Sequence, residues 1–435
     1  MSRWLQVRGA GWIVIGVVVS LVMGCWGCAV NPVTGEQELA FMSERQELAL
    51  GAKFFPRTIQ LMDGLPAKDP GLQAYAQSVG LKLAAVSHRP KLPWEFKVVN
   101  TSDVNASALP GGKIFITRGL ITRLTNEDQL AFIFGHEIGH VAARHHVAMY
   151  TRKVLASVAL VALAVAISDQ RWAQPLLLGA GLAGTLLLLS FSRDQERQAD
   201  ELGYIYMTKC GYHPKGMVGA FLILQQVAHE DQSLVTLLFR THPYLSERLE
   251  VARQRTKYAP ITLGFKTKAF DKALALQRDR APAYAAMDKG SKLAKQSLYY
   301  DALQQYKKAI SLFPDEGIFH VRLSTLFLRI GEPRKALKEA TIASRLAPRV
   351  FSPHLAAGLA CLRMNRVFEA LVWLKKADEL LPEYQPTKWA IACAYDRLGV
   401  KDRAIDYYQQ TVNIAPRTKL GRAAAARITL LRWGL

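Results

Sequence analysis

The chain contains an apolar segment with two histidines near its end, Leu130-Ala-Phe-Ile-Phe-Gly-His-Glu-Ile-Gly-His-Val-Ala-Ala-Arg144. Thr125-Asn-Glu-Asp128 precedes it with the pattern of a capping box, so the segment predicts a helix that begins after a loop. His136 and His140 are four residues apart, which places both imidazoles on one helix face. They can bind one metal ion there, and Glu137 lies where a general base for an activated water is needed.

An acidic segment further along, Ser192-Arg-Asp-Gln-Glu-Arg-Gln-Ala-Asp-Glu-Leu-Gly203, supplies more candidate ligands. A catalytic zinc site uses three protein ligands and keeps one position open. Glu196 and Asp200 are also four residues apart, so Glu196 can bind the metal while Asp200 reaches the second nitrogen of a ligand histidine. A solvated charged face is the alternative. With the histidine motif upstream, we predict one zinc ion per chain, bound by His136, His140 and Glu196.

These residues resemble the zinc site of the metallopeptidase family that includes HtpX and the CAAX prenyl endopeptidases. With the repeats described below, the resemblance is closest to its periplasmic, BepA-like branch and covers nearly the whole mature chain. One departure is Ser107, where a larger apolar residue is expected. Three further segments agree with the family, namely Asn31-Pro-Val-Thr-Gly35, Asn105-Ala-Ser-Ala-Leu-Pro-Gly-Gly112, and Thr241-His-Pro243 with Arg248.

The resemblance also implies roles for two residues beyond the ligands. It places His242 and Arg248 near the cleft. His242 would either stabilise the oxyanion or occupy the open position of zinc in a resting form, and Arg248 would orient the site. The alternative for this segment is a capping loop.

Periodic segments predict the surrounding secondary structure. Ser43 to Gly51 opens a helix with a cap, and a second helical stretch covers Leu72 to Ser87. Strands are predicted for Trp94 to Asn100 and, after a Pro-Gly-Gly turn, for Gly112 to Arg118. In zinc peptidases of this kind an edge strand binds substrate as an added strand. We assign this role to Gly112, Lys113, Ile114, Phe115 and Ile116; an interior strand is the alternative.

Two apolar segments lie between the two halves of the predicted metal site. They cover Val154 to Ser168 and Trp172 to Ser192, and the second has 21 residues without a charge. They form either a membrane-inserted hairpin or helices packed beside the site, and we favour the packed or membrane-dipping form. His145 lies half a helical turn out of phase with His136, so we expect neither it nor His146 to bind the metal.

The first 28 residues predict a secretory leader. Arg3 and Arg8 precede an apolar run that ends in small residues. Val22-Met-Gly-Cys25 resembles a lipobox, whereas Cys28 stands directly before the Asn-Pro-Val-Thr-Gly motif, so Cys25 or Cys28 is the predicted lipidation site. An uncleaved anchor is the alternative. Neither cysteine is followed by aspartate, which predicts sorting to the outer membrane.

Composition sets further limits. The 435 residues can form two or three domains, and the net charge of +21 points to nucleic acid, a membrane surface or acidic partners. We find no nucleic-acid-binding motif and expect no nucleic acid partner. Residues 283–435 have 25 basic and 13 acidic residues, so the excess is spread along the chain, as for a surface that faces anionic lipid. Cys210, Cys361 and Cys393 are isolated; a bridge between the last two is conceivable.

The last part of the chain repeats every 34 residues. Pro314, Pro348, Pro382 and Pro416 follow this period. Two sets of small residues share the frame, namely Gly290, Ser324, Gly358 and Ala392, and Ala302, Ala336, Ala370 and Ala404. This pattern is typical of tetratricopeptide repeats, in which small residues let paired helices approach closely. Thr418 to Trp433 reads as the helix that caps the array.

The sequence therefore predicts a mostly α-helical fold with a small β-sheet. We expect a leader in 1–28, a zincin-like metallopeptidase domain in 29–280 with an apolar helical hairpin at 154–192, and an α-solenoid of tetratricopeptide repeats in 281–435. The predicted function is a zinc endopeptidase of the bacterial periplasm, anchored to the outer membrane. Its predicted partners are unfolded or misassembled outer-membrane proteins, for their quality control, and the machinery that assembles them. The alternatives are a chaperone scaffold with latent proteolysis and a membrane-integral peptidase.

Overall fold

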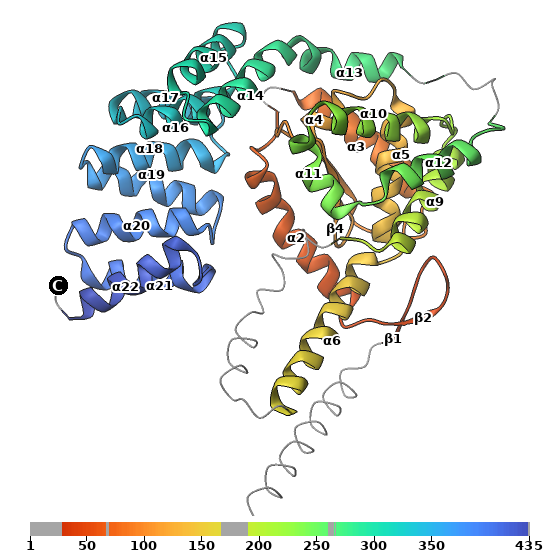
Figure 1. Cartoon of the computed structure of the whole chain (residues 1–435), viewed down its shortest axis with the longest axis horizontal. Helices are drawn as coiled ribbons and strands as arrows, with labels where there is room; N and C mark the ends of the chain where they lie inside the picture. Colours follow the sequence, from red (N-terminus) through yellow and green to blue (C-terminus); the bar gives the residue numbers. More distant parts are fainter. Residues whose placement is uncertain (1–27, 67–68, 167–189, 260–264, 266, 434–435) are drawn as a thin grey trace, which may run out of the picture. The chain divides into compact units, whose positions relative to one another are not determined.

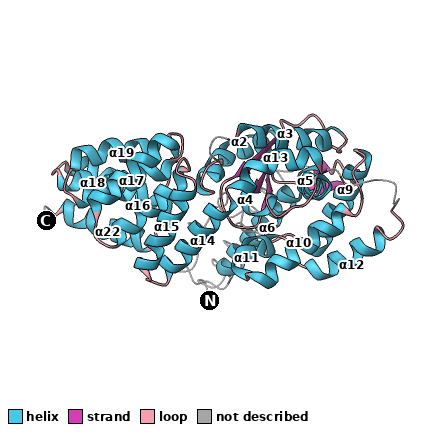
Figure 2. Cartoon of the chain, turned by 90° about the horizontal axis from the view of Figure 1, so that it is seen from above, coloured by secondary structure: helices cyan, strands magenta, loops and turns pink. Residues whose placement is uncertain are grey.

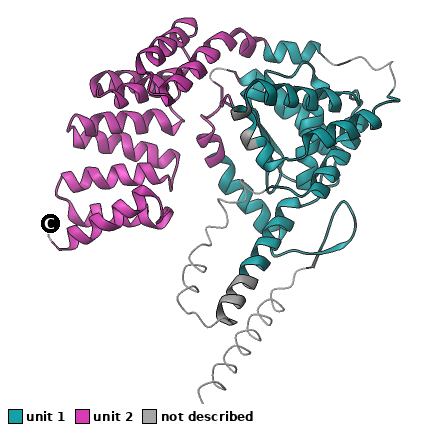
Figure 3. Ribbon diagram, in the orientation of Figure 1, with its two compact units in different colours: residues 1–56, 70–98, 103–274 teal, residues 57–69, 99–102, 275–435 magenta. Residues whose placement is uncertain are grey.

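A computed structural model of the chain describes residues 28–66, 69–166, 190–259, 265 and 267–433. Most of these residues are helical, and the described strands form two small sheets (Figures 1 and 2). The predicted fold class is confirmed. The chain divides into two compact units: unit 1 has residues 1–56, 70–98 and 103–274, and unit 2 has residues 57–69, 99–102 and 275–435 (Figure 3).

Helix α5 (Glu127–Ala142) is the core of unit 1. All its residues from Asp128 to Ala142 are buried, and it packs against helices α3, α9 and α10 and strand β4. Two phenylalanines of α5 pack against neighbouring elements, Phe132 on Phe221 and Phe134 on Phe96. The other helices with residues in unit 1 are α2 (Glu44–Leu61), α3 (Pro70–Ala85), α4 (Arg118–Ile121), α6 (His145–Ala166), α9 (Arg193–Lys209), α10 (Gly216–Glu230), α11 (Gln232–Thr241), α12 (Leu245–Arg255) and α13 (Lys268–Asp279).

A three-stranded sheet covers part of this core. Strands β3 (Glu95–Val99), β4 (Ala106–Leu109) and β5 (Lys113–Thr117) form it in the order β3-β5-β4, and β4 and β5 are antiparallel. Gly111 and Gly112 take φ values of 75° and 81° in the turn that joins β4 to β5. Only glycine adopts this backbone conformation without strain, which explains the Pro-Gly-Gly segment.

The sheet order corrects our prediction of the edge strand. The segment Gly112, Lys113, Ile114, Phe115 and Ile116 falls on the turn and on β5, which is the central strand. Ile114, Phe115 and Ile116 are buried in the core, so alternation could not distinguish an interior strand from an edge strand. The edge strand that contacts α5 is β4, which we did not predict because it has only four residues, most of them small.

The described chain begins with a small hairpin of β1 (Cys28–Val30) and β2 (Gln37–Leu39), which are antiparallel. Asn31 at its turn accepts a hydrogen bond from the Val33 backbone at 2.9 Å and donates one to the Ala143 carbonyl at 3.4 Å. The Asn-Pro-Val-Thr-Gly motif thus joins the start of unit 1 to the end of α5.

Two predictions fall mainly outside the described residues. The leader, including Cys25, lies in residues 1–27, and much of the predicted apolar hairpin lies in residues 167–189. The first predicted apolar segment, from Val154, is helical up to Ala166, where α6 ends. None of the described helices is both long and apolar enough to span a membrane.

Three glycines bring α5 and α9 into backbone contact. A Cβ added to Gly135 would lie 3.0 Å from the Gly203 Cα, and one added to Gly203 would lie 2.9 Å from the His136 nitrogen. A Cβ on Gly139 would lie 3.1 Å from the Ala199 carbonyl oxygen. A side chain at Gly203 would force a shift of the two helices, and one at Gly135 or Gly139 would make unusually tight contacts, so the glycines allow the two metal-binding segments to approach this closely.

The helices of unit 2 from Ala281 onward form the predicted array of pairs, and the unit also includes residues 57–69 and 99–102, which the prediction assigned to the peptidase domain. Each repeat proline lies two residues beyond the end of a helix, as Pro314 follows Leu312 and Pro348 follows Leu346. Thr418 caps the last helix by accepting a hydrogen bond from the Gly421 backbone. The helices are α14 (Ala281–Lys295), α15 (Tyr299–Leu312), α16 (Gly317–Arg329), α17 (Pro333–Leu346), α18 (Phe351–Arg363), α19 (Val367–Leu380), α20 (Gln385–Arg397), α21 (Lys401–Ile414) and α22 (Lys419–Arg432).

The small residues of the repeat frame are at helix contacts. A Cβ on Gly358 would lie 2.6 Å from the Leu374 side chain, and Ser324 donates a hydrogen bond to the Ala336 carbonyl at 2.8 Å. The four alanines of the second set are fully buried. Cys361 and Cys393 are both free, so the conceivable bridge between them does not form in this structure.

The contact between α5 and α9 gives a stability prediction. We expect Gly203→Ala to destabilise the protein by about 1–3 kcal/mol, because the new methyl group meets the His136 backbone. Thermal unfolding followed by circular dichroism measures this loss. Asp194→Ala on the same helix is the control, because its carboxylate is 92% exposed and should change the stability by less than about 0.5 kcal/mol. Equal stability of the two variants would contradict the glycine argument.

Candidate active site

Side-chain caps determine where the two metal-binding helices begin. Asn126 caps α5 by accepting a hydrogen bond from the Gln129 backbone at 3.0 Å, so the cap lies one residue later than predicted, and the Gln129 side chain accepts from the Thr125 backbone instead of closing a capping box. Ser192 caps α9 in a complete capping box with Gln195. These caps satisfy backbone donors that would otherwise lack partners, and they set which residues of each helix face the site.

Four buried side chains meet between these helices: His136, His140, Glu196 and His242. One possible ligand atom from each lies within 4.8 Å of the others. The Nε2 atoms of the two α5 histidines are 3.0 Å apart. Glu196 places Oε1 3.4 Å from His140 Nε2 and Oε2 3.7 Å from His136 Nε2. Two imidazole nitrogens and a carboxylate oxygen directed at one point suit a zinc-like metal ion.

Asp200 and Arg248 support His136 from the side away from the cluster. Asp200 Oδ1 lies 2.9 Å from His136 Nδ1. Arg248 on α12 forms a bidentate ion pair with Asp200, with N–O distances of 2.6 and 2.7 Å. The other terminal nitrogen of its guanidinium pairs with Glu196. Arg248 therefore holds two carboxylates in place: that of Asp200, which orients His136, and that of Glu196, which is a candidate metal ligand.

The pKa shifts of Glu196, Asp200 and His140 favour the protonation states that bind a metal ion. Burial raises the pKa of Glu196 and of Asp200, but the Arg248 charge and neighbouring groups outweigh burial and bring both values below the ordinary range. Burial lowers the pKa of His140 well below its ordinary range. Ionised carboxylates and a neutral imidazole are the forms that bind a metal ion.

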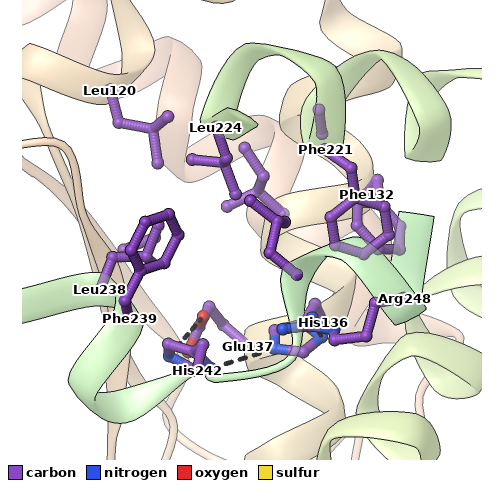
Figure 4. A pocket seen from close by; sticks show the side chains of 14 residues that line it. Leu120, Phe132, His136, Glu137, Phe221, Leu224, Leu238, Phe239, His242 and Arg248 are labelled. Atoms are coloured by element: carbon purple, nitrogen blue, oxygen red, sulfur yellow. Dashed lines mark hydrogen bonds and ion pairs between the residues drawn. The ribbon is translucent and has the colours of Figure 1, made fainter. Parts of the chain in front are cut away.

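Glu137 and His242 face each other beside the cluster (Figure 4). Glu137 Oε1 is 3.7 Å from His242 Nε2, and its buried Oε2 has no hydrogen-bond partner among the described residues. His242 Nδ1 lies 3.0 Å from Glu196 Oε1 and 3.4 Å from His136 Nε2. Burial lowers the pKa of His242, but the charges of Glu196 and Glu137 outweigh it and raise that pKa. The His242 ring is therefore part of the cluster, and the unpartnered oxygen of Glu137 is available to a water or substrate.

His145 lies beside a candidate ligand, which helical phase did not predict. Its Nδ1 is 2.8 Å from His140 Nδ1, and its Nε2 is 2.8 Å from Gln198 Oε1 on α9. We expected His145 to point away because we continued the helix past its end. Helix α5 stops at Ala142, and Arg144 takes a φ of 54°, so the chain turns and brings His145 back to the site.

These contacts determine which nitrogen of His140 can bind a metal ion. For Nε2 to offer a lone pair to the metal, Nδ1 must carry the proton and donate it to His145 Nδ1. His145 then donates its Nε2–H to the oxygen of Gln198. The pair of Gln198 and His145 thus holds His140 in the metal-binding tautomer, as Asp200 does for His136.

The site defines the class of the domain. Two histidines one helical turn apart, a glutamate directly after the first, and a carboxylate from a second helix make a metallopeptidase site of the HExxH type. Residues 70–256 match the family model described as Peptidase family M48. This region of the chain is therefore an M48 metallopeptidase domain.

Individual relatives agree with the family. The chain is 32% identical to the Beta-barrel assembly-enhancing protease of Yersinia pestis over 232 residues, which are 52% of this chain and 46% of that protein. It is 33% identical to Metalloprotease YcaL of Escherichia coli over 166 residues, 38% of this chain and 62% of that protein. The chain thus spans about half the length of the curated relatives it matches. A solved structure titled Crystal structure of MamA is similar over 33% of this chain and 83% of that chain, with 23% identity and a TM-score of 0.31.

The hydrogen bonds of His145 give a prediction about metal binding. We expect His145→Phe to weaken metal affinity by roughly tenfold to a hundredfold, because His140 loses the acceptor that fixes its tautomer. His145→Asn should retain most of the affinity, since its amide oxygen takes the place of Nδ1. Competition with a chromogenic chelator measures this affinity.

His146→Phe is the matched control for this prediction. His146 is a buried neighbour that packs on Phe191 and hydrogen-bonds to the Ala108 backbone, and among the described contacts it has none with His136, His140 or Glu196. Equal metal affinity of His145→Phe and His146→Phe would contradict the role of His145.

Proposed function

We propose that the protein is a zinc endopeptidase in which His136, His140 and Glu196 bind the metal ion. The observation that carries this proposal is the convergence of these three buried groups with Glu137 beside them. When bound, zinc would supply Lewis-acid activation of a water molecule and of the scissile carbonyl. One zinc ion per chain is expected.

The roles of the other residues follow from their positions. Glu137 accepts the proton of the attacking water on its unpartnered oxygen and delivers it to the leaving amine. Asp200 and Arg248 hold His136 and Glu196 in place through their ion pairs. We propose that substrate pairs with β4, the edge strand that contacts α5, through backbone hydrogen bonds.

His242 gives the site a resting form. Its Nδ1 lies at hydrogen-bond distance from Glu196 and near His136, so its ring occupies the space next to the ligand atoms. We propose that His242 takes the open metal position when no substrate is present and leaves it when substrate enters.

The setting of the activity is also a proposal. The relative in Yersinia pestis is named a Beta-barrel assembly-enhancing protease, and the first 28 residues have the pattern of a lipoprotein leader. We propose a periplasmic enzyme anchored to the outer membrane through Cys25 or Cys28. Its clients would be unfolded or misassembled outer-membrane proteins, held by the tetratricopeptide array together with their assembly machinery.

A scaffold with latent proteolysis is the second candidate. The observation in its favour is the His242 ring within the ligand cluster, which fits a site that is closed most of the time. Such a scaffold would keep its cellular role after loss of the general base. Complementation of a deletion strain with Glu137→Gln therefore separates the two candidates.

Glu137→Gln also tests the chemistry directly. We expect kcat/KM for an unfolded outer-membrane protein to fall by about a hundredfold to ten-thousandfold, because the amide cannot accept the proton of the water. The zinc content, measured by atomic emission, should remain one per chain. Glu201→Gln on α9 is the control, since its carboxylate is 43% exposed and lies outside the cluster. Unchanged cleavage by Glu137→Gln would refute the proposed mechanism.

His242→Ala tests the resting form. We expect basal cleavage to rise about threefold to tenfold, because the site no longer needs to release its own side chain before substrate enters. His229→Ala on α10 should leave the rate unchanged, as His229 is exposed. A fall in the rate of tenfold or more in His242→Ala would instead assign His242 to the stabilisation of the oxyanion.

A further inference from the structure

An apolar pocket opens next to the candidate metal cluster. His136, Glu137 and His242 lie along one side of it, and the rest of its lining is almost entirely apolar (Figure 4). The walls come from two parts of the sequence, β4, α4 and α5 in the first and α10, α11 and α12 in the second. The apolar side chains that matter below are Leu120, Phe132, Phe221, Leu224, Leu238 and Phe239.

The pocket lies where a side chain of a bound peptide would reach. Glu137, which we propose as the general base, is in its lining, so the pocket adjoins the bond that would be cut. Ala106, the first residue of β4, also lines it. A peptide added to β4 would direct alternate side chains to one face. One residue next to the scissile bond would therefore enter the pocket.

The polar groups at the pocket are already paired or are acidic. Arg248 lines the pocket, but its guanidinium is committed to Asp200 and Glu196 and lies over the Phe221 ring at 5.0 Å. It is not free to bind a substrate carboxylate, and Glu137 disfavours one. A carboxylate side chain here would lose its hydration without gaining a partner, and a cationic one would pair with the Glu137 oxygen that the attacking water needs. An apolar side chain gains from burial.

The size of the pocket narrows the choice further. Its volume is about 40 Å³. This exceeds the roughly 10–15 Å³ that one water molecule needs, so a small apolar side chain can enter the pocket. A branched aliphatic side chain needs less space than an aromatic ring, so we expect the unaltered pocket to favour it.

We propose that this pocket is the specificity subsite of the peptidase and binds a branched aliphatic side chain, such as that of leucine or valine, from a residue flanking the scissile bond. The proposal rests on the proposed peptidase function. It also fits clients that expose apolar strands when they are unfolded, since a folded protein buries such residues.

Cleavage of a peptide series by the zinc-loaded full chain tests the proposal. The peptides carry leucine, valine, phenylalanine, aspartate or lysine at each of the two positions next to one bond. We expect kcat/KM with leucine or valine at one of these positions to exceed that with aspartate or lysine by roughly tenfold to a hundredfold. The same rate for all five residues at both positions would overturn the proposal.

Two variants of α10 form a matched pair. Leu224→Ala enlarges the pocket and should raise kcat/KM for phenylalanine relative to leucine by about tenfold. Leu222→Ala, two residues earlier, removes the same side chain from an exposed position outside the pocket and should leave the preference unchanged. An equal effect of the two changes, or no change of preference in Leu224→Ala, would also overturn the proposal.

Binding separates this proposal from the proposed function. Peptide hydroxamates with the same side chains bind through the metal and need no catalysis, so their Kd is measured by calorimetry on the zinc-loaded Glu137→Gln variant. A preference for leucine and valine of tenfold or more supports the proposed specificity of the pocket, whether or not any peptide is cleaved. A complete lack of cleavage would refute only the peptidase function. Equal affinities, or no binding by any hydroxamate, overturn the pocket.

Discussion

The backbone contact between α5 and α9 is the constraint on which the site depends. Gly135 and Gly139 on one helix and Gly203 on the other allow a separation that no side chain would permit. At this separation Glu196 reaches the imidazoles of His136 and His140, and Gln198 reaches His145. The helix caps act with the glycines, because they fix which faces of the two helices meet. The close approach of the two helices and the faces that they present bring the histidines of α5 and Glu196 of α9 into one site.

Charge is the second constraint. Glu137, Glu196 and Asp200 place three carboxyl groups in a buried cluster that contains one guanidinium, that of Arg248. Burial of an unbalanced set of charges is costly, and a divalent cation between the histidines and Glu196 would offset it. The same residues therefore have two effects: Arg248 keeps Glu196 and Asp200 ionised, and the excess of carboxylates favours a metal ion. The apolar side chains of the adjoining pocket lower the local polarity and strengthen both effects.

The repeats show how far a periodic sequence predicts structure. A period of 34 residues located the helix pairs, their terminating prolines and the capping helix, because each pair repeats the same local contacts. The sheet shows the limit. The alternation of Ile114 and Ile116 correctly indicated a strand, but the position of that strand within the sheet depends on β3 and on β4, a strand too short to recognise from sequence.

The sequence by itself determined the ligand motif, the helical repeats and the fold class. Each depends on local sequence. A spacing of four residues places His136 and His140 on one face wherever the helix lies, and each repeat packs against the repeat that follows it in the sequence. Only the tertiary structure decided which strand forms the edge, that His145 supports His140, and that an apolar pocket adjoins Glu137. The family resemblance places His242 near the cleft, and the structure brings its ring into the cluster. These features join segments that are distant in the sequence, as in the contact of His136 with His242, which are 106 residues apart. Their geometry comes from packing and from the turn at Arg144, which no helical periodicity predicts.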